Sequence, residues 1–471
     1  MLVIYNTLSK QKEEFIPLEK GKIKMYVCGP TVYDLFHIGN ARSFINSDFI
    51  RKYLEYKGYE VSFAMNLTDV DDKIINKANA ENKTPREVAE FFTRAFFDDI
   101  VKLGVKPATI YPKATEHIGD IISMIERLIQ NGYAYNQDGN VFFDISKFKN
   151  YGKLSGKNID DLIEGARVEI NTAKQNPLDF ALWKSAKPGE PAWESPWSTG
   201  RPGWHIECSA MSCKHLGDTF DIHAGGNDLI FPHHENEIAQ SEAANGKTFV
   251  RYWLHFGFLN INNEKMSKSL GNFQTARDFL VHYSAETIRF FFAQTHYGAP
   301  LNFANEGLES AKRGLQKIDN LIQRITNSLE SAVDVPDSLS AFDIAQFRTA
   351  FESAMDDDFN TPRACGVLFD FIRDANKALD AYPAAPRQLL IAIKEFLDIT
   401  AAGIFGIASF EQANTNAPSL ENELIELLIS VRVEAKKQKQ YQLSDFVRDE
   451  LAKLGIVLQD GKDKTTFKKL S

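Results

Sequence analysis

Residues 21–67, which read GKIKMYVCGPTVYDLFHIGNARSFINSDFIRKYLEYKGYEVSFAMNL, decide the fold class. The apolar run at 21–27 predicts a strand, and the large apolar side chains of 41–58 recur at the spacing of a helix. Residues 59–67 predict the next strand. A strand, a helix and a strand this close together form a βαβ unit, so we expect the two strands to be parallel.

Two segments directly follow these strands, at the edge where parallel sheets bind ligands. The first is CGPTVYDLFHIGN at 28–40, and the second is NLTDVDD at 66–72. Gly39 lets the backbone approach a ligand closely, and the helix that follows presents free N–H groups to a phosphate. His37 can donate to that phosphate; the alternative is a loop histidine that caps the helix.

The rest of the chain divides by pattern. With 471 residues we expect about three domains. The first is an α/β, Rossmann-type parallel-sheet catalytic domain at 1–310, with an insertion at about 115–204 that is rich in turns and tryptophan. Helical spacing predicts a bundle at 311–410, and a small C-terminal module occupies 421–471. Turn-forming residues predict linkers at 333–340 and 411–420.

Composition excludes several classes of protein. The chain is 44% hydrophobic and 25% charged, which excludes a disordered chain. Four cysteines are too few for a disulfide scaffold, and no apolar run is long enough to span a membrane, so we expect a cytoplasmic protein. The net charge is −9, yet residues 431–471 carry +4. This basic end predicts contact with RNA, or alternatively a solvated amphipathic helix.

A second motif, KMSKS at 265–269, suits a mobile loop that closes over a polyphosphate. Lys265 and Lys268 would neutralise the charge that develops on a leaving pyrophosphate, and the serines, Ser267 among them, would add hydrogen bonds. Between HIGN at 37–40 and KMSKS, the segment GND at 226–228 follows an apolar strand. Its Asp228 carboxylate can accept from two ribose hydroxyls, or it forms an Asx turn.

Four side chains form a candidate metal site. Cys28 ends the first strand, Cys208 lies 180 residues later, and His233 and Glu237 are four apart, so on a helix they share one face. All are zinc-binding residue types, although their spacing alone does not select them. His234 and Glu235 stay open as alternative ligands.

Other chemistry-bearing residues have competing interpretations. Each cysteine considered by itself is more often a small buried hydrophobe, and we interpret Cys213 and Cys365 in that way. The acids Asp69, Asp71 and Asp72 predict either a Mg²⁺ site or, as we prefer, loop caps and ion pairs with Lys73. Three further histidines are expected near the metal or in the core: His205, His223 and His255.

The motifs together resemble the cysteinyl-tRNA synthetases, a family of class I aminoacyl-tRNA synthetases with HIGH and KMSKS signatures. The segments that carry the resemblance span 28–272 in the family's order: CGPTVYDLFHIGN, NLTDVDDKI, NPLDFALWK, GWHIECSAM, DIHAGGNDLIFPHHENEIAQSEA and KMSKSLGN. One position departs from the signature, because Asn40 stands where its name has histidine. Asparagine still donates hydrogen bonds, so we expect the role to be kept.

The resemblance implies ATP-dependent ligation of L-cysteine to tRNA(Cys) through a cysteinyl-adenylate, by a monomer that contacts no membrane. It implies one Zn²⁺ that selects the substrate thiol, with ATP bound as its Mg²⁺ complex. The bundle and the C-terminal module would grip the tRNA stem and anticodon. The implied residues are, for catalysis, His37, Asn40, Lys265 and Lys268; for ATP, Thr31, Gly39, Gly226, Asp228, Ser267 and Lys268; for the amino acid, Thr68 and Trp204; and for zinc, Cys28, Cys208, His233 and Glu237.

Two alternatives share these motifs. A cysteine:amino-sugar ligase of mycothiol biosynthesis resembles the catalytic core but lacks the long C-terminal region that is present here at 311–471. A non-catalytic tRNA-binding paralogue is expected to have lost its phosphate-binding lysines or its metal ligands, and both sets are present in this sequence.

Overall fold

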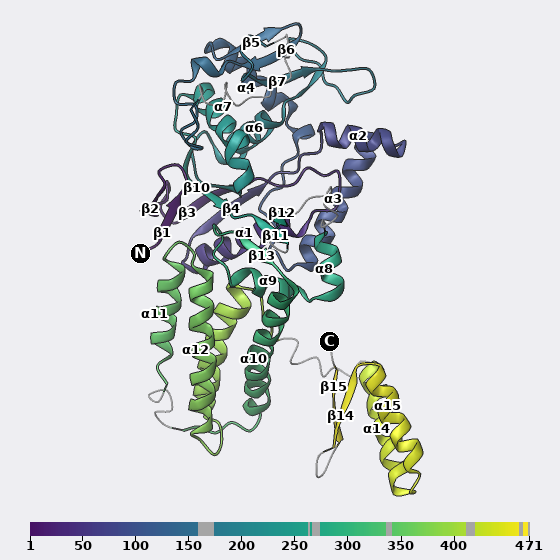
Figure 1. The fold of residues 1–471 in the computed structure, drawn as a ribbon. Coiled ribbons are helices and arrows are strands. Elements are labelled where there is room, and N and C mark those ends of the chain that lie inside the picture. The colour runs from purple at the N-terminus through teal and green to yellow at the C-terminus, as the bar shows by residue number, and fades with distance from the viewer. Residues whose placement is uncertain are drawn as a thin grey trace. The chain divides into compact units, whose positions relative to one another are not determined.

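The computed structural model describes residues 1–158, 174–261, 264–265, 274–335, 342–410, 420–460 and 465–469. It forms two compact units, residues 1–408 and 409–471 (Figure 1). None of the described helices combines the length and the apolar composition needed to cross a membrane.

A parallel sheet lies at the centre of the first unit, with strand order β10–β9–β3–β4. Its strands are β3 (Lys22–Val27), β4 (Glu60–Met65), β9 (Phe220–Gly226) and β10 (Val250–Phe256). Val27 pairs with Met65 on one side and with Ala224 on the other, so the strands end at a common edge. The predicted βαβ unit is confirmed as β3–α1–β4.

Helices cover this sheet and extend from its edge. They are α1 (Ile38–Tyr56), α2 (Asp72–Glu81), α3 (Pro85–Lys102), α6 (Trp204–Leu216) and α7 (Glu235–Asn245). Helix α1 begins at Ile38, three residues before the start that the apolar spacing indicates, because the His37 side chain caps it. An N-terminal hairpin joins β10 through β1 (Val3–Asn6), which pairs with β2 (Gln11–Glu14).

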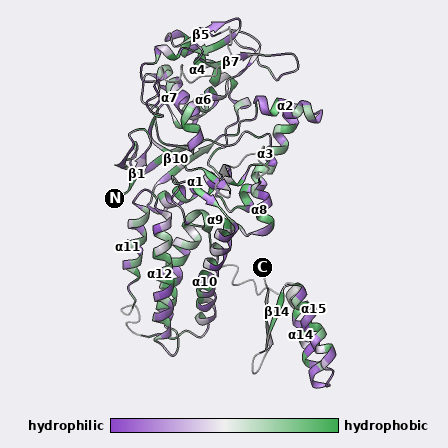
Figure 2. Cartoon of the chain, in the orientation of Figure 1, coloured by the Kyte–Doolittle hydropathy of each residue, from purple (hydrophilic) through white to green (hydrophobic). Residues whose placement is uncertain are grey.

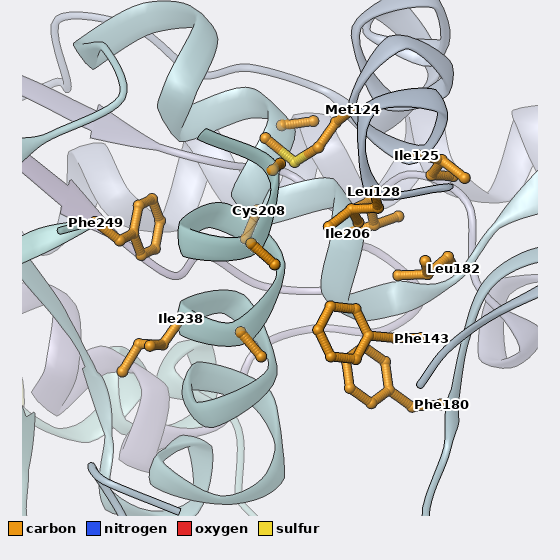
Figure 3. Packing of buried hydrophobic residues seen from close by; sticks show 14 of the residues in the cluster. Met124, Ile125, Leu128, Phe143, Phe180, Leu182, Ile206, Cys208, Ile238 and Phe249 are labelled. Carbon is orange, nitrogen blue, oxygen red and sulfur yellow. The ribbon is translucent and has the colours of Figure 1, made fainter. Parts of the chain in front are cut away.

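The insertion is a small α/β layer of its own. Its elements are α4 (Ile118–Gln130) and the antiparallel strands β5 (Ala134–Gln137), β6 (Asn140–Phe143), β7 (Phe180–Ser185) and β8 (Gly200–Pro202). Apolar residues of α4, β6 and β7 pack in one cluster with residues of α6 and α7 (Figure 3). The insertion and the sheet's helices therefore share a single hydrophobic core.

A short sheet and two helices connect the parallel sheet to the bundle. They are β11 (Leu259–Ile261), β12 (Glu264–Lys265), α8 (Ala276–His282), α9 (Ala285–Ala293) and β13 (Leu301–Phe303). Strand β11 continues from β10, pairs with β12 antiparallel and pairs with β13 parallel. The backbone that leads to the KMSKS motif is therefore fixed to the segment that precedes the bundle.

The bundle contains α10 (Asn305–Leu329), α11 (Ile344–Met355), α12 (Thr361–Asp380), α13 (Arg387–Leu397) and η7 (Asp398–Ile404). Buried residues of α10 recur every three or four positions, and hydrophobic and hydrophilic colours share these helices in Figure 2. This is the pattern of an amphipathic helix with one core-facing stripe. The predicted linker at 333–340 lies mostly outside the described residues.

The second unit contains α14 (Leu420–Lys437), α15 (Tyr441–Lys453), β14 (Ile456–Asp460) and β15 (Thr465–Lys469). The two strands form an antiparallel hairpin. Its core comprises Ile425, Ile429, Val447, Leu451 and Ile456. Nearly all of the predicted linker at 411–420 lies outside the described residues.

Candidate active site and metal centre

A cavity of about 490 Å³ opens at the carboxyl edge of the parallel sheet. It is lined by segments that follow β3, β9 and β10, as expected for a ligand site in such a sheet. Most of the residues expected to bind substrate line it: Thr31, His37, Gly39, Asn40, Trp204, Gly226 and Asp228. A larger cavity of about 840 Å³, between α3 and the turn at 189–191, contains none of them.

His37 combines both roles that the sequence left open. Its Nδ1 accepts a hydrogen bond from the Asn40 backbone at 3.2 Å, so the imidazole caps α1. The same side chain lines the cavity, beside Asn40. The N-terminus of α1 thus points the positive end of its dipole at the cavity, which favours an anionic ligand. The free N–H groups that the sequence led us to expect are mostly engaged, because Ile38 donates to Gln274, and Asn40 and Ala41 donate to His37.

The four candidate metal ligands lie together beside this cavity. One potential ligand atom from each of Cys28, Cys208, His233 and Glu237 lies within 4.8 Å of the others. His233 Nε2 is 3.0 Å from Glu237 Oε1, and Cys28 Sγ is 3.7 Å from the same oxygen. His233 lies in a short π-helical turn, Ile230–His234, that runs into α7, and its ring reaches the Glu237 carboxylate four residues later.

Mutual contacts and burial shift the pKa values of all four side chains in this cluster. Although burial raises the pKa of Glu237, the neighbouring His223 and His233 bring it down to about 2. A hydrogen bond from Cys28 lowers the pKa of Cys208 to about 6, while burial raises that of Cys28. Although burial lowers the pKa of His233, contacts with Glu237 and Cys208 raise it to about 10, so its proton balances part of the negative charge when no cation is bound. The thiol, imidazole and carboxylate groups of the cluster are a zinc donor set.

Of the two alternative ligands that spacing left open, the structure keeps His234 near the cluster and places Glu235 in other contacts. Glu235 is buried, but its carboxylate accepts from the backbone N–H of Leu154 at 3.2 Å and of Ser155 at 2.8 Å, in the insertion. His234 stays beside the cluster, with Nε2 3.3 Å from Cys28 Sγ. A second group of potential ligands therefore consists of Cys28, His223, His234 and Glu237, and it shares Cys28 and Glu237 with the first group.

A chain of hydrogen bonds leads away from Cys28. His234 Nδ1 lies 2.8 Å from His255 Nε2, and His255 Nδ1 lies 2.8 Å from Thr7 Oγ1. Burial lowers the pKa of His255 to about 3 and that of His234 well below its usual range, so both rings are neutral. Thr7, in the N-terminal hairpin, was missed by sequence reasoning because no local pattern links it to residue 255.

Two of the histidines expected near the metal, His223 and His205, brace the candidate ligands Glu237 and His233. His223 Nε2 lies 2.9 Å from Glu237 Oε2, and His205 Nδ1 lies 2.9 Å from His233 Nδ1. Trp204 stacks on His233 with ring centroids 4.3 Å apart and is 39% exposed, so it forms a wall of the cavity next to the cluster.

Thr68 differs from Trp204, because it is buried and does not line this cavity. Its hydroxyl donates to Glu207 at 3.3 Å and accepts from the Asn66 amide at 3.2 Å. The backbone of Thr68 pairs with that of Thr31, which does line the cavity. Thr68 is therefore placed behind the wall rather than in it.

The three acids at 69–72 act separately. Asp71 caps α2 by accepting from the Lys73 backbone, and Asp69 accepts from the Thr115 backbone at 3.0 Å. The expected ion pair with Lys73 is wrong for Asp72, which pairs with Lys184 and Arg201 of the insertion. The preferred loop caps are confirmed, and the carboxylates do not converge as a Mg²⁺ site would require.

The KMSKS residues are described only in part. The backbone of Lys265 ends β12, whereas Ser267 and Lys268 lie outside the described residues. Cys213 and Cys365 take part in neither candidate ligand group, and burial raises the pKa of each thiol to about 12. Cys365 is buried, as predicted, whereas Cys213 is only partly buried and packs against the core of the catalytic domain.

Comparison with known proteins identifies the family. Residues 14–313 match the family of tRNA synthetases class I (C) catalytic domain, and residues 350–409 match the DALR domain. The chain is 51% identical to the cysteine–tRNA ligase of Thermococcus onnurineus, with 99% of both chains covered. It is 50% identical to that of Bacillus cereus, again with 99% of both covered. This chain belongs to the cysteine–tRNA ligases.

Solved structures support the fold of this ligase. Methionyl-tRNA synthetase of Mycobacterium tuberculosis, in complex with methionyl-adenylate, matches with a TM-score of 0.65 at 15% identity, over 83% of this chain and 93% of that one. A leucyl enzyme of Agrobacterium radiobacter matches with a TM-score of 0.62 at 11% identity, over 86% of this chain and 87% of that one. The Rossmann-type class I fold predicted from the sequence is confirmed. The curated relatives also match through the C-terminal region, and the comparisons give no support to an amino-sugar acceptor.

Proposed function

We propose that this chain activates L-cysteine with ATP in the cavity at the sheet edge and transfers it to tRNA(Cys). The observation that carries the proposal is the position of the thiol-, imidazole- and carboxylate-bearing cluster beside the N-terminus of α1. One end of the cavity thus suits a thiol, and the other suits a polyphosphate.

The metal centre is proposed to hold one Zn²⁺ through Cys28, Cys208, His233 and Glu237. Bound there, Zn²⁺ would supply a soft Lewis acid that prefers a thiolate to a hydroxyl, and so distinguishes cysteine from serine. His223 and His205 hold Glu237 and His233 by hydrogen bonds, and Trp204 covers His233. These contacts keep the ligand side chains in one arrangement before substrate arrives.

Activation forms one bond and breaks one. A carboxylate oxygen of cysteine attacks the α-phosphorus of ATP, an acyl–phosphate bond forms, and pyrophosphate leaves with the electron pair of the broken P–O bond. The carboxylate is already ionised at neutral pH, so no residue has to remove a proton. The residues then act by alignment and by stabilising charge on the transferring phosphate.

His37 and Asn40 are proposed to donate to the phosphates from the N-terminus of α1, with Gly39 and Gly226 leaving room for the nucleotide. Asp228, on the opposite segment of the cavity, is proposed to accept from the ribose hydroxyls. Lys265 and Lys268 would close over the leaving pyrophosphate, which Mg²⁺ accompanies. Thr31 is proposed to support the nucleotide from the cavity wall.

The second step moves the cysteinyl group to a ribose hydroxyl of the tRNA 3′-adenosine, and AMP leaves. We propose that the bundle contacts the tRNA stem and that the second unit contacts the anticodon, GCA. Residues 431–471 carry +4 on a chain of net charge −9, so the basic end is the part that suits a polyanion. We expect the ligase to act as a cytoplasmic monomer.

The test is transfer of labelled cysteine onto total bacterial tRNA with ATP and Mg²⁺. We expect acid-precipitable label that depends on all three, and serine in place of cysteine should give none. Cysteine-dependent ATP–pyrophosphate exchange without labelled tRNA would contradict the proposed acceptor and favour a small amine. The absence of both reactions would contradict the proposed activation.

A further inference from the structure

Arg42 lies one turn inside α1 and is among the largest fully buried side chains, with 1% of its surface exposed. Its guanidinium donates four hydrogen bonds to backbone carbonyls. The acceptors are Gly257 at 2.7 Å, Phe258 at 3.1 Å, His296 at 3.1 Å and Ala299 at 2.6 Å. The catalytic scheme above gives this residue no part.

The charge of Arg42 has no carboxylate partner among the described residues, and carbonyl dipoles alone compensate it. Burial lowers its pKa to about 10, which still leaves the guanidinium protonated at neutral pH. Keeping a charge in the interior is costly unless it is well hydrogen-bonded. An apolar side chain would fill this space more cheaply, so the four bonds themselves need an explanation.

The four carbonyls belong to two segments, and only the first of them lines the cavity. Gly257 and Phe258 line it directly and continue into β11. The turn that contains His296 and Ala299 leads into β13, which pairs with β11. Additional bonds join the two segments, because Gly257 N–H donates to Tyr297 and Leu301 N–H donates to Phe258.

The approach of these two segments is close. A Cβ on Gly257 would lie 2.2 Å from the Ala299 carbonyl oxygen, so only glycine fits there. Arg42 grips both sides of this contact, while His37, Gly39 and Asn40, at the start of the same helix, form the phosphate side of the cavity. One helix thus carries both the phosphate-binding end and the clamp on the facing wall.

We propose that Arg42 is a positioning residue for ATP, which holds the 257–259 wall at a fixed place relative to the N-terminus of α1. The inference rests on the proposed function, since it assumes that ATP occupies this cavity. Its planar fork of five N–H groups reaches carbonyls on two segments at once, whereas a lysine ammonium has only three donors at one point. Lysine leaves at least one of the four carbonyls without its partner.

The chain offers a matched control in Arg289 of α9. It is also fully buried and donates to the carbonyls of Phe405, Leu103 and Gly104, and to Asp48 at 2.6 Å. None of these partners lines the cavity at the sheet edge. Arg289→Lys therefore measures what the loss of a buried guanidinium does by itself.

The experiment compares Arg42→Lys, Arg289→Lys and the unaltered chain by cysteine-dependent ATP–pyrophosphate exchange. We expect Arg42→Lys to raise the KM for ATP about tenfold, the cost of about one hydrogen bond, with the KM for cysteine unchanged. Arg289→Lys should leave both KM values unchanged while lowering the melting temperature. An unchanged KM for ATP in Arg42→Lys, or an equal rise in both KM values, overturns the inference.

Hydrogen–deuterium exchange of the unaltered chain keeps the test decisive if Arg42→Lys does not fold. A non-hydrolysable ATP analogue should slow exchange at Gly257, Leu259 and Leu301, and cysteine should not. Unchanged exchange at these amides with the analogue present overturns the inference. Failure of the proposed function gives a different result, because the unaltered chain would then show no cysteine-dependent ATP–pyrophosphate exchange at all.

Discussion

At the scale of single residues, two cysteines on α6 offer a direct comparison. Cys208 belongs to the candidate ligand cluster, whereas Cys213, five residues later, accepts a hydrogen bond from Asn245 at 3.5 Å. Cys208→Ser replaces a thiolate donor by a neutral hydroxyl, which binds zinc weakly. We expect the zinc content after dialysis to fall well below one per chain, measured by atomic emission.

Cys213→Ser is the control, and it should retain one zinc per chain. Equal zinc in the two variants would contradict the proposed ligand set. Zinc lost from both would point instead to disruption of α6 as a whole.

His37 can be divided into its two roles. His37→Asn keeps a side-chain oxygen that accepts from the Asn40 backbone, because asparagine is a good N-cap, but it removes the imidazole from the cavity. We expect ATP–pyrophosphate exchange to fall by about 10²-fold with an unchanged melting temperature. A slow variant that also melts early would mean that the cap, rather than phosphate binding, explains the loss.

Some of these site residues could be predicted from local sequence motifs, whereas others could be assigned only by resemblance to the family. His37 and Gly39 could be placed because their motif is local and lies between a strand and a helix. The ligand set came only from family resemblance, since spacing left His234 and Glu235 open. Glu235 is engaged by Leu154 and Ser155, about 80 positions away in the chain, and no local pattern contains that contact.

At the scale of elements, Asp358 joins the bundle to the catalytic domain. It lies between α11 and α12 in a left-handed conformation, with φ of 61°. Its carboxylate accepts from the Tyr297 hydroxyl at 2.6 Å and from the Tyr5 backbone at 2.9 Å. Periodicity predicted the helical bundle but neither the break between α11 and α12 nor this junction, because the partners of Asp358 lie 61 and 353 residues away.

Asp358→Ala should destabilise the chain by about 3 kcal/mol, because it leaves the Tyr297 hydroxyl and the Tyr5 N–H without their acceptor and removes the short polar side chain that favours the left-handed conformation. Equilibrium unfolding in urea measures this free energy. Asp358→Asn is the matched variant, since asparagine tolerates that backbone conformation and keeps one acceptor oxygen. An alanine variant as stable as the asparagine one would contradict the importance of the junction.

The pairing of the strands in the insertion also could not be predicted from the sequence. The strand at 141–143 was expected, and β6 occupies Asn140–Phe143. Its neighbour β7 lies some 40 residues on, and the antiparallel order β5–β6–β7–β8 depends on which faces are buried together. Such non-local pairing is not encoded in the spacing of any one segment.

At the scale of the whole molecule, the two units predict separable activities. A chain that ends at Ala408 keeps the cavity and the candidate metal cluster but loses the second unit, in which residues 431–471 carry +4. We expect its cysteine-dependent ATP–pyrophosphate exchange to match that of the full chain. Transfer to tRNA should fall by at least about tenfold, because phosphate contacts dominate affinity for nucleic acid.

Both reactions are measured on the same preparations, with zinc content as the control for an intact core. Full charging of tRNA by the shortened chain would show that the second unit is dispensable. Loss of exchange together with charging would show that the two units do not act separately.

The shared hydrophobic core has a consequence for protein engineering. Cys208 lies on α6, and Figure 3 shows it among side chains of α4, β6, β7 and α7. The insertion therefore packs directly against the helix that carries a candidate metal ligand, and its removal would disturb that helix. A shortened enzyme made by excising the insertion would expose these apolar side chains and release that ligand, so any shortened variant has to keep the insertion.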